Sequence, residues 1–358
     1  MVCIRNYAES DAPAVARLRR RVFAHTAHAD DDSLADYLNE VFLRNPWYSD
    51  DLAPLVAETE GGELVGFHGL ISRTMRLGDK NIRVAVGTQF MVNPDHRGMA
   101  GILLLRAFFN GPQDLSVTDI STPVVAKLWQ RMGGKSMRLQ RLHWTRPIRP
   151  VRYAASVAGA SGLRRFATRA AGPLLSLVDS LIVSAGSQYS INRPPTRLKN
   201  LEAELMAEKF SGLVPADILR PVYDKNGLSW LFSQISRKEN NKKTYKLAVV
   251  AAETDDLIGW FVFVATGRVA EVVQIAAGPG HMRAVTNQLL SFASDLNCRA
   301  VSGRCDSHVF EELESPPAFF EQSDRYFLTH TKNPDIAAAI DSQRFFFTRL
   351  EGEWWMTF

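Results

Sequence analysis

Hydrophobic and polar residues alternate in short runs along the first 150 positions, and segments with helical spacing lie between these runs. The pattern predicts strands over residues 2–6, 55–58, 63–72, 82–92 and 115–118, and helices over 9–23, 33–43, 97–109 and 123–132. Gly61-Gly62 predicts a tight turn, because glycine takes up positive φ without strain. We expect residues 136–144 to close this first unit.

A similar order of elements follows residue 195. Alternating runs at 245–252, 257–264 and 270–277 precede Gly278-Pro279-Gly280, a helical segment to residue 296 and a strand over 300–303. Residues 151–195 are rich in Ala, Gly, Ser, Leu and Arg, and predict helix broken at glycines. Because 358 residues exceed the usual size of one core, we predict two units, 1–150 and 196–358, joined by a helical linker over 151–195. The strands and helices that both patterns predict indicate an α/β fold.

Charge is unevenly distributed, although the net charge is only +4. No acidic residue lies between Asp119 and Asp179, and the basic residues in this interval are Lys127, Arg131, Lys135, Arg138, Arg141, Arg146, Arg149, Arg152, Arg164, Arg165 and Arg169. Such a field favours an anionic partner: the phosphates of a coenzyme, an acidic substrate, a membrane surface or nucleic acid. A merely solvated basic surface is the alternative.

The apolar run at 173–183 is too short to span a membrane and contains Asp179. Two interpretations remain open for it, an interfacial membrane helix that would make a peripheral contact and a connecting helix packed between the units. Cys3, Cys298 and Cys305 form neither a disulfide framework nor a zinc motif, so we expect no metal and a cytoplasmic protein. The first seven residues alternate like a strand and lack the apolar core of a signal peptide.

The connection between the strand 82–92 and the helix 97–109 is suited to an anion. Amide groups at a helix N-terminus have no intrahelical acceptor, and the helix dipole adds partial positive charge there. Small residues let a pyrophosphate approach the backbone, and Arg97 adds a cation.

The segment Arg97-Gly98-Met99-Ala100-Gly101 resembles the acyl-CoA-binding loop of the GNAT superfamily of N-acetyltransferases, whose motif is Arg or Gln, two residues, Gly, one residue, then Gly or Ala. Ala100 occupies the fourth position of this motif. Gly101 supplies the small final residue if the loop in this chain is one residue shorter than the motif. The stretch from Leu128 to Gly134 is similar to one on the last helix of many members. Trp129 aligns there with a tyrosine that often protonates the departing thiolate, and an indole is no useful acid.

This resemblance covers about residues 1–150 and implies an α/β fold of the α+β type, with a mixed sheet flanked by helices in each unit. It also implies direct transfer of an acyl group from acetyl-CoA or another acyl-CoA, as cosubstrate, to an amine of an unidentified acceptor. The residues that it implies for acyl-CoA binding are Phe90, Met91, Val92, Arg97, Gly98, Met99, Ala100 and Gly101. His68 and Asp119 are the candidate bases, since a base must accept a proton from the amine. Each has a structural alternative: His68 as a satisfied strand histidine, and Asp119 as a cap of the next helix near Ser121.

The second unit lacks the Arg-Gly opening after its third strand, so we expect a degenerate GNAT-like domain that shapes the acceptor cleft; an unrelated α/β domain is the competing interpretation. Two other functions stay open. One is a regulatory module that binds acyl-CoA without turnover, which the missing tyrosine favours. The other is an aminoacyl transferase of the FemABX kind, in which the basic stretch would hold tRNA. Because the acyl-CoA loop gives no reason for RNA, we do not expect nucleic acid as a partner.

Overall fold

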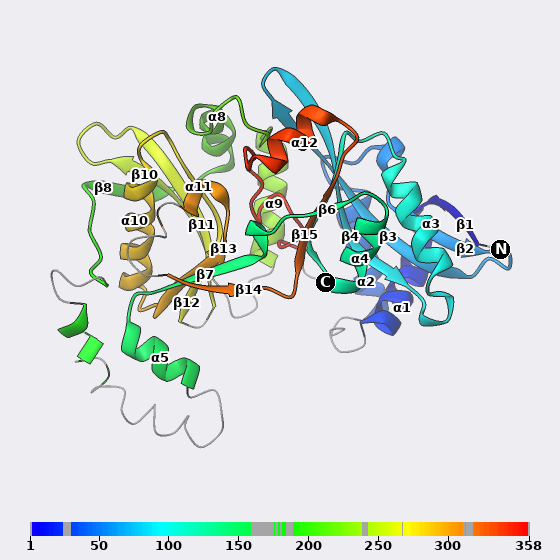
Figure 1. The fold of residues 1–358 in the computed structure, drawn as a ribbon, viewed down its shortest axis with the longest axis horizontal. Helices are drawn as coiled ribbons and strands as arrows, with labels where there is room; N and C mark the ends of the chain where they lie inside the picture. The colour runs from blue at the N-terminus through cyan, green and yellow to red at the C-terminus, as the bar shows by residue number, and fades with distance from the viewer. Residues whose placement is uncertain are drawn as a thin grey trace.

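The computed structural model describes residues 2–23, 30–158, 175, 178–179, 181–183, 189–237, 243–266, 268–310, 312 and 318–356. Two mixed β-sheets lie side by side, and helices flank both of them (Figure 1). This confirms the predicted fold class. Within the described residues, no helix is both long enough and apolar enough to cross a membrane.

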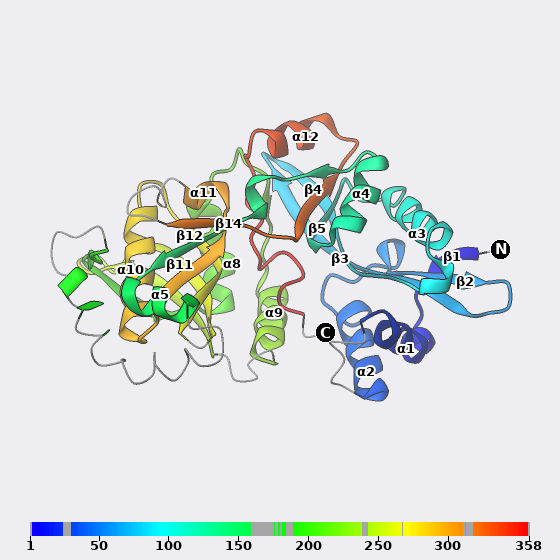
Figure 2. The same ribbon diagram turned by 60° about the horizontal axis from the view of Figure 1, so that its bottom comes forward.

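The first sheet has the strand order β1-β2-β3-β4-β5-β15-β6, and a short strand, β9, also pairs with β3. The bounds are β1 Val2–Asn6, β2 Leu55–Thr59, β3 Leu64–Leu77, β4 Lys80–Val92, β5 Leu115–Ser121, β6 Lys135–Ser136, β9 Arg220–Pro221 and β15 Tyr326–His330. Only the β4–β5 pair is parallel. Helices α1 (Ala12–Val22) and α2 (Asp31–Phe42) pack on one face, and α3 (Met99–Phe109) and α4 (Pro123–Arg131) on the other (Figure 2).

The second sheet has the order β14-β7-β13-β12-β11-β10-β8. The bounds are β7 Leu142–Pro147, β8 Thr196–Asn200, β10 Lys243–Ala251, β11 Leu257–Thr266, β12 Val269–Ala277, β13 Ala300–Arg304 and β14 Phe319–Gln322. Helix α10 (Met282–Asp295) covers one face, and α8 (Ala203–Leu213) and α9 (Lys225–Arg237) cover the other. The described remainder includes α5 (Pro150–Ala158), α11 (Ser307–Phe310) and α12 (Pro334–Asp341), with four short 3-10 segments.

The expected elements are present, most of them within a few residues of their predicted limits. Gly62 has a φ of +79°, which confirms the tight turn before β3. β3 and β4 extend further than predicted, to Leu77 and from Lys80, and β3 pairs with β9 near this end. The repeated order is also confirmed: an antiparallel strand pair, a helix and a parallel strand occur as β3-β4-α3-β5 and again as β11-β12-α10-β13.

The two sheets exchange strands, which the pattern did not predict. The expectation that residues 136–144 close the first unit is wrong, because β7 pairs with β13 and β14 in the second sheet. The side chain of Trp144 is buried there in the core beneath α10. Conversely, β15 lies between β5 and β6 in the first sheet. As a division into domains, the ranges 1–150, 151–195 and 196–358 stay a prediction.

One hydrophobic core spans both sheets. It includes residues of α1, α2, α8 and α9, one face of each sheet, and the C-terminal segment, which we define as residues 345–356. Figure 2 shows this segment in red between the two sheets. Of the predicted linker, α5 is helical as expected, whereas five of the eleven residues of the apolar run at 173–183 lie outside the described residues.

Candidate active site

The parallel strands β4 and β5 separate before they end. Their pairing runs from Val84 with Leu115 to Val86 with Val117, yet β4 continues to Val92 and β5 to Ser121. The register between β3 and β4 also shifts beside His68, where Gln89 has a φ of +46°. Such a β-bulge bends a strand and redirects its side chains. Together, these two features form a wedge-shaped opening in the first sheet.

A cavity of about 180 Å³ lies at this opening. The residues that line it come from the C-terminal end of α1, from β3, β4, β5 and α4, and from the chain before β15. One residue of the C-terminal segment also lines the cavity. The lining residues are Phe23, His68, Gly87, Thr88, Gln89, Phe90, Thr118, Ile120, Ser121, Thr122, Val125, Trp129, Arg325 and Glu353. Two of the predicted site residues, His68 and Phe90, therefore lie together, and Trp129 lines the same cavity.

The predicted acyl-CoA loop lies at the start of α3, directly after β4. Gly98 is the N-cap residue and has a φ of +104°, a conformation that other residues rarely adopt. Arg97 and Met99 are exposed, whereas Ala100 is buried. A side chain added to Gly101 would lie 3.5 Å from the ring of Phe90, so the helix packs closely on β4. Exposed amides, small residues and a cation are thus combined as a pyrophosphate site requires.

His68 is buried between two aromatic rings, with centroid distances of 5.0 Å to Phe90 and 4.6 Å to Phe108. Its Nδ1 atom has no hydrogen-bond partner, so it is not the satisfied histidine of the structural alternative. Burial lowers the pKa of the imidazole to about 3. His68 is therefore neutral at physiological pH, and it is a weak proton acceptor.

Asp119 is buried near the end of β5 and does not cap the following helix. The N-cap of α4 is Thr122, whose side chain accepts a hydrogen bond from the amide of Val125. Asp119 instead accepts a hydrogen bond from the amide of Glu353, at 3.0 Å, and forms an ion pair with Arg304, at 3.4 Å. Burial raises the pKa of the Asp119 carboxyl, and the charge of Arg304 opposes this effect.

Glu353 is the site residue that the sequence reasoning missed. Its carboxylate accepts hydrogen bonds from the hydroxyl groups of Thr88, at 2.5 Å, and Thr118, at 3.1 Å. Burial, and secondly the charge of Asp119, raise the pKa of this carboxyl to about 8. A signal was present, because a glutamate directly before Trp354-Trp355 places an ionisable group in an apolar run. Nothing local, however, links this residue to strands more than 230 positions away.

The C-terminal segment passes so close to β5 that only glycine fits at position 352. A Cβ atom there would lie 2.1 Å from Oδ2 of Asp119. This approach lets the amide of Glu353 reach Asp119 and brings its carboxyl group into the cavity. The position of Glu353 thus depends on its neighbour in the chain.

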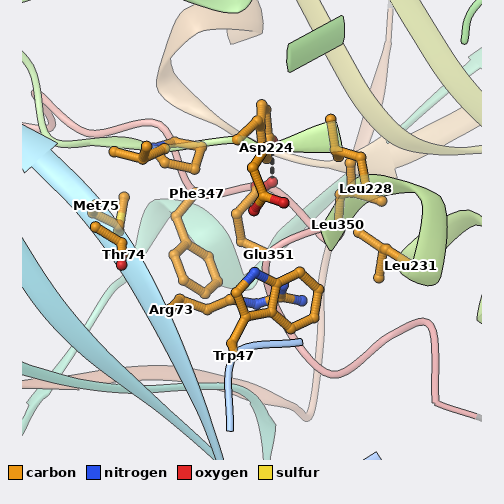
Figure 3. Close-up of a pocket in the computed structure, with 13 residues that line it drawn as sticks. Trp47, Arg73, Thr74, Met75, Asp224, Leu228, Leu231, Phe347, Leu350 and Glu351 are labelled. Carbon is orange, nitrogen blue, oxygen red and sulfur yellow. Dashed lines mark hydrogen bonds between the residues drawn. The ribbon is translucent and has the colours of Figure 1, made fainter. Parts of the chain in front are cut away.

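A second cavity lies between β3, α9 and the C-terminal segment (Figure 3). Its volume is about 20 Å³, which is room for one water molecule. The guanidinium group of Arg73 stacks on Trp47, with 3.4 Å between its central carbon and the ring centroid. Glu351 accepts a hydrogen bond from the hydroxyl of Tyr223, and burial raises the pKa of both groups. Glu351 and Glu353 therefore point to different sites, although only one residue separates them.

In the described part of the chain, no three His, Cys, Asp or Glu side chains are grouped as a metal site requires. The lining of the first cavity includes the carboxyl group of Glu353 and the hydroxyl groups of Thr88 and Thr118.

Comparison with known proteins gives a consistent picture. Residues 3–108 match the family model of the GNAT acetyltransferase domain. No curated protein sequence matches the chain. Among solved structures, a conserved protein of unknown function from Enterococcus faecalis V583, described as a probable N-acyltransferase, is 10% identical and has a TM-score of 0.61; the match covers 92% of this chain and 73% of that one.

Two further solved structures are GCN5-related N-acetyltransferases. The protein from Kribbella flavida is 14% identical, with a TM-score of 0.58 and coverage of 96% of this chain and 74% of that one. The protein from Anabaena variabilis ATCC 29413 is 12% identical, with a TM-score of 0.58 and coverage of 92% and 72%. At these identities the likeness concerns the fold alone. Over residues 3–108 the chain is similar to the GNAT acetyltransferase domain, and its fold is similar to that of these three solved structures.

Proposed function

We propose that the protein is an acetyl-CoA-dependent N-acetyltransferase whose reaction takes place in the cavity between β4 and β5. The observation that carries this proposal is the buried carboxyl group of Glu353 at the opening of the first sheet, beside the predicted acyl-CoA loop. Its pKa of about 8 is close to the value that suits a proton acceptor at physiological pH.

In the proposed reaction, the amine nitrogen of the acceptor attacks the carbonyl carbon of the thioester. The new C–N bond forms as the C–S bond breaks, and the amine transfers a proton to the carboxylate of Glu353. Coenzyme A leaves as a thiolate and takes up a proton from solvent, and Glu353 releases the proton of the amine to solvent, which restores its carboxylate. Because no covalent enzyme intermediate is needed, holding the reactants together contributes most of the acceleration.

The residues predicted for the acyl-CoA fit this scheme. The first amides of α3 and the side chain of Arg97 would hold the pyrophosphate, and the backbone from Phe90 to Val92 would align the pantetheine arm. His68 would shape the cavity as a neutral side chain, because its pKa is too low for the role of base. Asp119 would act on Glu353 rather than on the amine, since it is held by Arg304 and by the amide of Glu353.

A calorimetric titration with acetyl-CoA tests the binding part of this proposal. We expect about one equivalent to bind to the native chain, and the double variant Arg97→Glu, Gly98→Asp to lose at least roughly tenfold in affinity, because it places two negative charges at the pyrophosphate site. Arg106→Glu reverses the charge of one arginine, as Arg97→Glu does, but in the last turn of α3, and should bind normally.

Unchanged affinity in the folded double variant would show that the loop is not the acyl-CoA site. Amine acceptors are then screened for acetylation with the native protein. If acetyl-CoA binds but no amine is acetylated, the non-catalytic acyl-CoA-binding module becomes the better interpretation.

A further inference from the structure

The second sheet contributes one cation to the site in the first sheet. Arg304 is the last residue of β13, and its side chain is buried. Its Nη1 atom lies 3.4 Å from Oδ2 of Asp119, and its Nε atom lies 3.1 Å from Oδ1 of Asp306. Its Nη2 atom donates a hydrogen bond to the carbonyl of Phe347 in the C-terminal segment. The guanidinium group is thus fixed on three sides.

Asp119 and Glu353 are both buried, and the carboxyl groups lie close enough for the charge of one to raise the pKa of the other. Two adjacent carboxyl groups in a medium of low dielectric constant do not both ionise near neutral pH, so the pair retains a proton. Glu353 accepts hydrogen bonds from hydroxyl groups on two strands. Among the described residues, Arg304 is the only arginine within ion-pair distance of either carboxyl group, and its partner is Asp119.

We propose that Arg304 is a positioning residue through which the second sheet determines which of these two carboxyl groups holds the shared proton. With Arg304 present, Asp119 is ionised and Glu353 is the group that gains and loses a proton near neutral pH. Without Arg304, Asp119 would keep the proton. Glu353, still stabilised by Thr88 and Thr118, would then ionise at a lower pH. This inference rests on the proposed function, which makes Glu353 the proton acceptor.

Other charged groups face the pair from the surrounding elements. Arg349, in the C-terminal segment, is paired with Glu271 and adds a weaker positive field at Asp119. His143, opposite Arg304 in the strand register, has a pKa lowered first by burial and then by Arg349 and Arg304. His68 and Arg325 line the cavity on the side of Glu353. None of these four side chains has a hydrogen bond or ion pair to Asp119 in the described structure, so the assignment centres on Arg304.

The test follows the Glu353 carboxyl group directly, by carbon-13 NMR titration of the full chain labelled at its glutamate carboxyl carbons. The resonance is assigned from its absence in Glu353→Gln. We expect the titration midpoint to fall by about one pH unit or more in Asp119→Asn, and likewise in Arg304→Met. The double variant should match Asp119→Asn within about 0.3 pH units, because Arg304 then has no carboxylate to hold.

Arg283→Met removes an exposed arginine from α10 in the same half of the chain, and should leave the midpoint unchanged. A midpoint that stays the same or rises in Arg304→Met overturns the proposal. If that variant does not fold, Arg304→Gln keeps a donor for the Phe347 carbonyl, and the same criterion applies to it. Because the titration needs no substrate, failure of acyl transfer would count against the proposed function without affecting this result.

Discussion

At the scale of single residues, the protonation of Glu353 has consequences for both activity and stability. Burial first, and Asp119 second, raise the pKa of its carboxyl to about 8, well above the value in an unfolded chain. Between these two values the folded protein binds a proton that the unfolded chain has released. The contribution of this group to the free energy of unfolding is therefore fully present at low pH and is lost as the pH rises through 8.

Glu353→Gln should abolish the proton transfer while keeping a side chain of the same shape. We expect the rate of acyl transfer to fall by roughly 10² to 10⁴, and the rise of activity with pH toward about 8 to disappear. Profiles of the reaction rate against pH check this prediction. Titrations with acetyl-CoA serve as the control, because the affinity for acetyl-CoA should be unchanged in the variant. Glu351→Gln makes the same change at the neighbouring cavity and should keep the pH dependence; an unaltered profile in Glu353→Gln would exclude Glu353 as the base.

Gly352→Ala tests the close approach to β5. The added methyl group would lie 2.1 Å from Oδ2 of Asp119, so the segment must shift, at a cost of about 1–3 kcal/mol in the free energy of unfolding. Activity should fall too, because Glu353 moves with the backbone. Gly212→Ala in α8 is the matched control: nothing lies within 4 Å, and alanine favours the helix. Denaturant unfolding curves compare the two, and equal stabilities would contradict the described contact.

At the scale of elements, alternation and turn residues were sufficient to predict β4, α3 and the loop between them. These are local features, and Arg97 to Gly101 lie within one short stretch of sequence. The same alternation did not reveal the register shift beside His68, because a β-bulge depends on how two strands pair. It also could not assign β7 or β15 to a sheet, since a strand has the same pattern of residues in either one.

The candidate site could be predicted only in part, again because the pattern of residues reports local features and not contacts between distant segments. His68 and Phe90 were both named from the sequence, and the structure brings them together because adjacent strands of one hairpin carry them. Glu353 and Arg304 could not be placed, because they reach Thr88 and Asp119 over separations of 265 and 185 residues. Such contacts arise from tertiary packing and leave no periodic signal in the chain.

At the scale of the whole molecule, the exchange of strands makes the first sheet dependent on the rest of the chain. A fragment of residues 1–150 lacks β15, which separates β5 from β6, and it lacks the C-terminal segment of the shared core. We expect this fragment to show no cooperative thermal transition by circular dichroism, in contrast to the full chain, because the edge of β5 and much apolar surface are exposed.

Mixing the fragment with residues 151–358 should restore part of the transition, since the missing strand is then supplied by a second chain. A sharp transition of the isolated fragment, together with binding of acetyl-CoA, would show instead that the first unit folds independently of the strand exchange.

The position of Glu353 near the end of the sequence also affects the order in which the molecule becomes competent during synthesis. The strands that bind the acyl-CoA in our proposal leave the ribosome first, but the sheet lacks β15 until residue 330 has been made, and the carboxyl group of the site follows later. A nascent chain that has not reached residue 353 would contain the residues that match the GNAT domain model, 3–108, without the proposed proton acceptor. In our proposal, acyl transfer would begin only once residue 353 has been made.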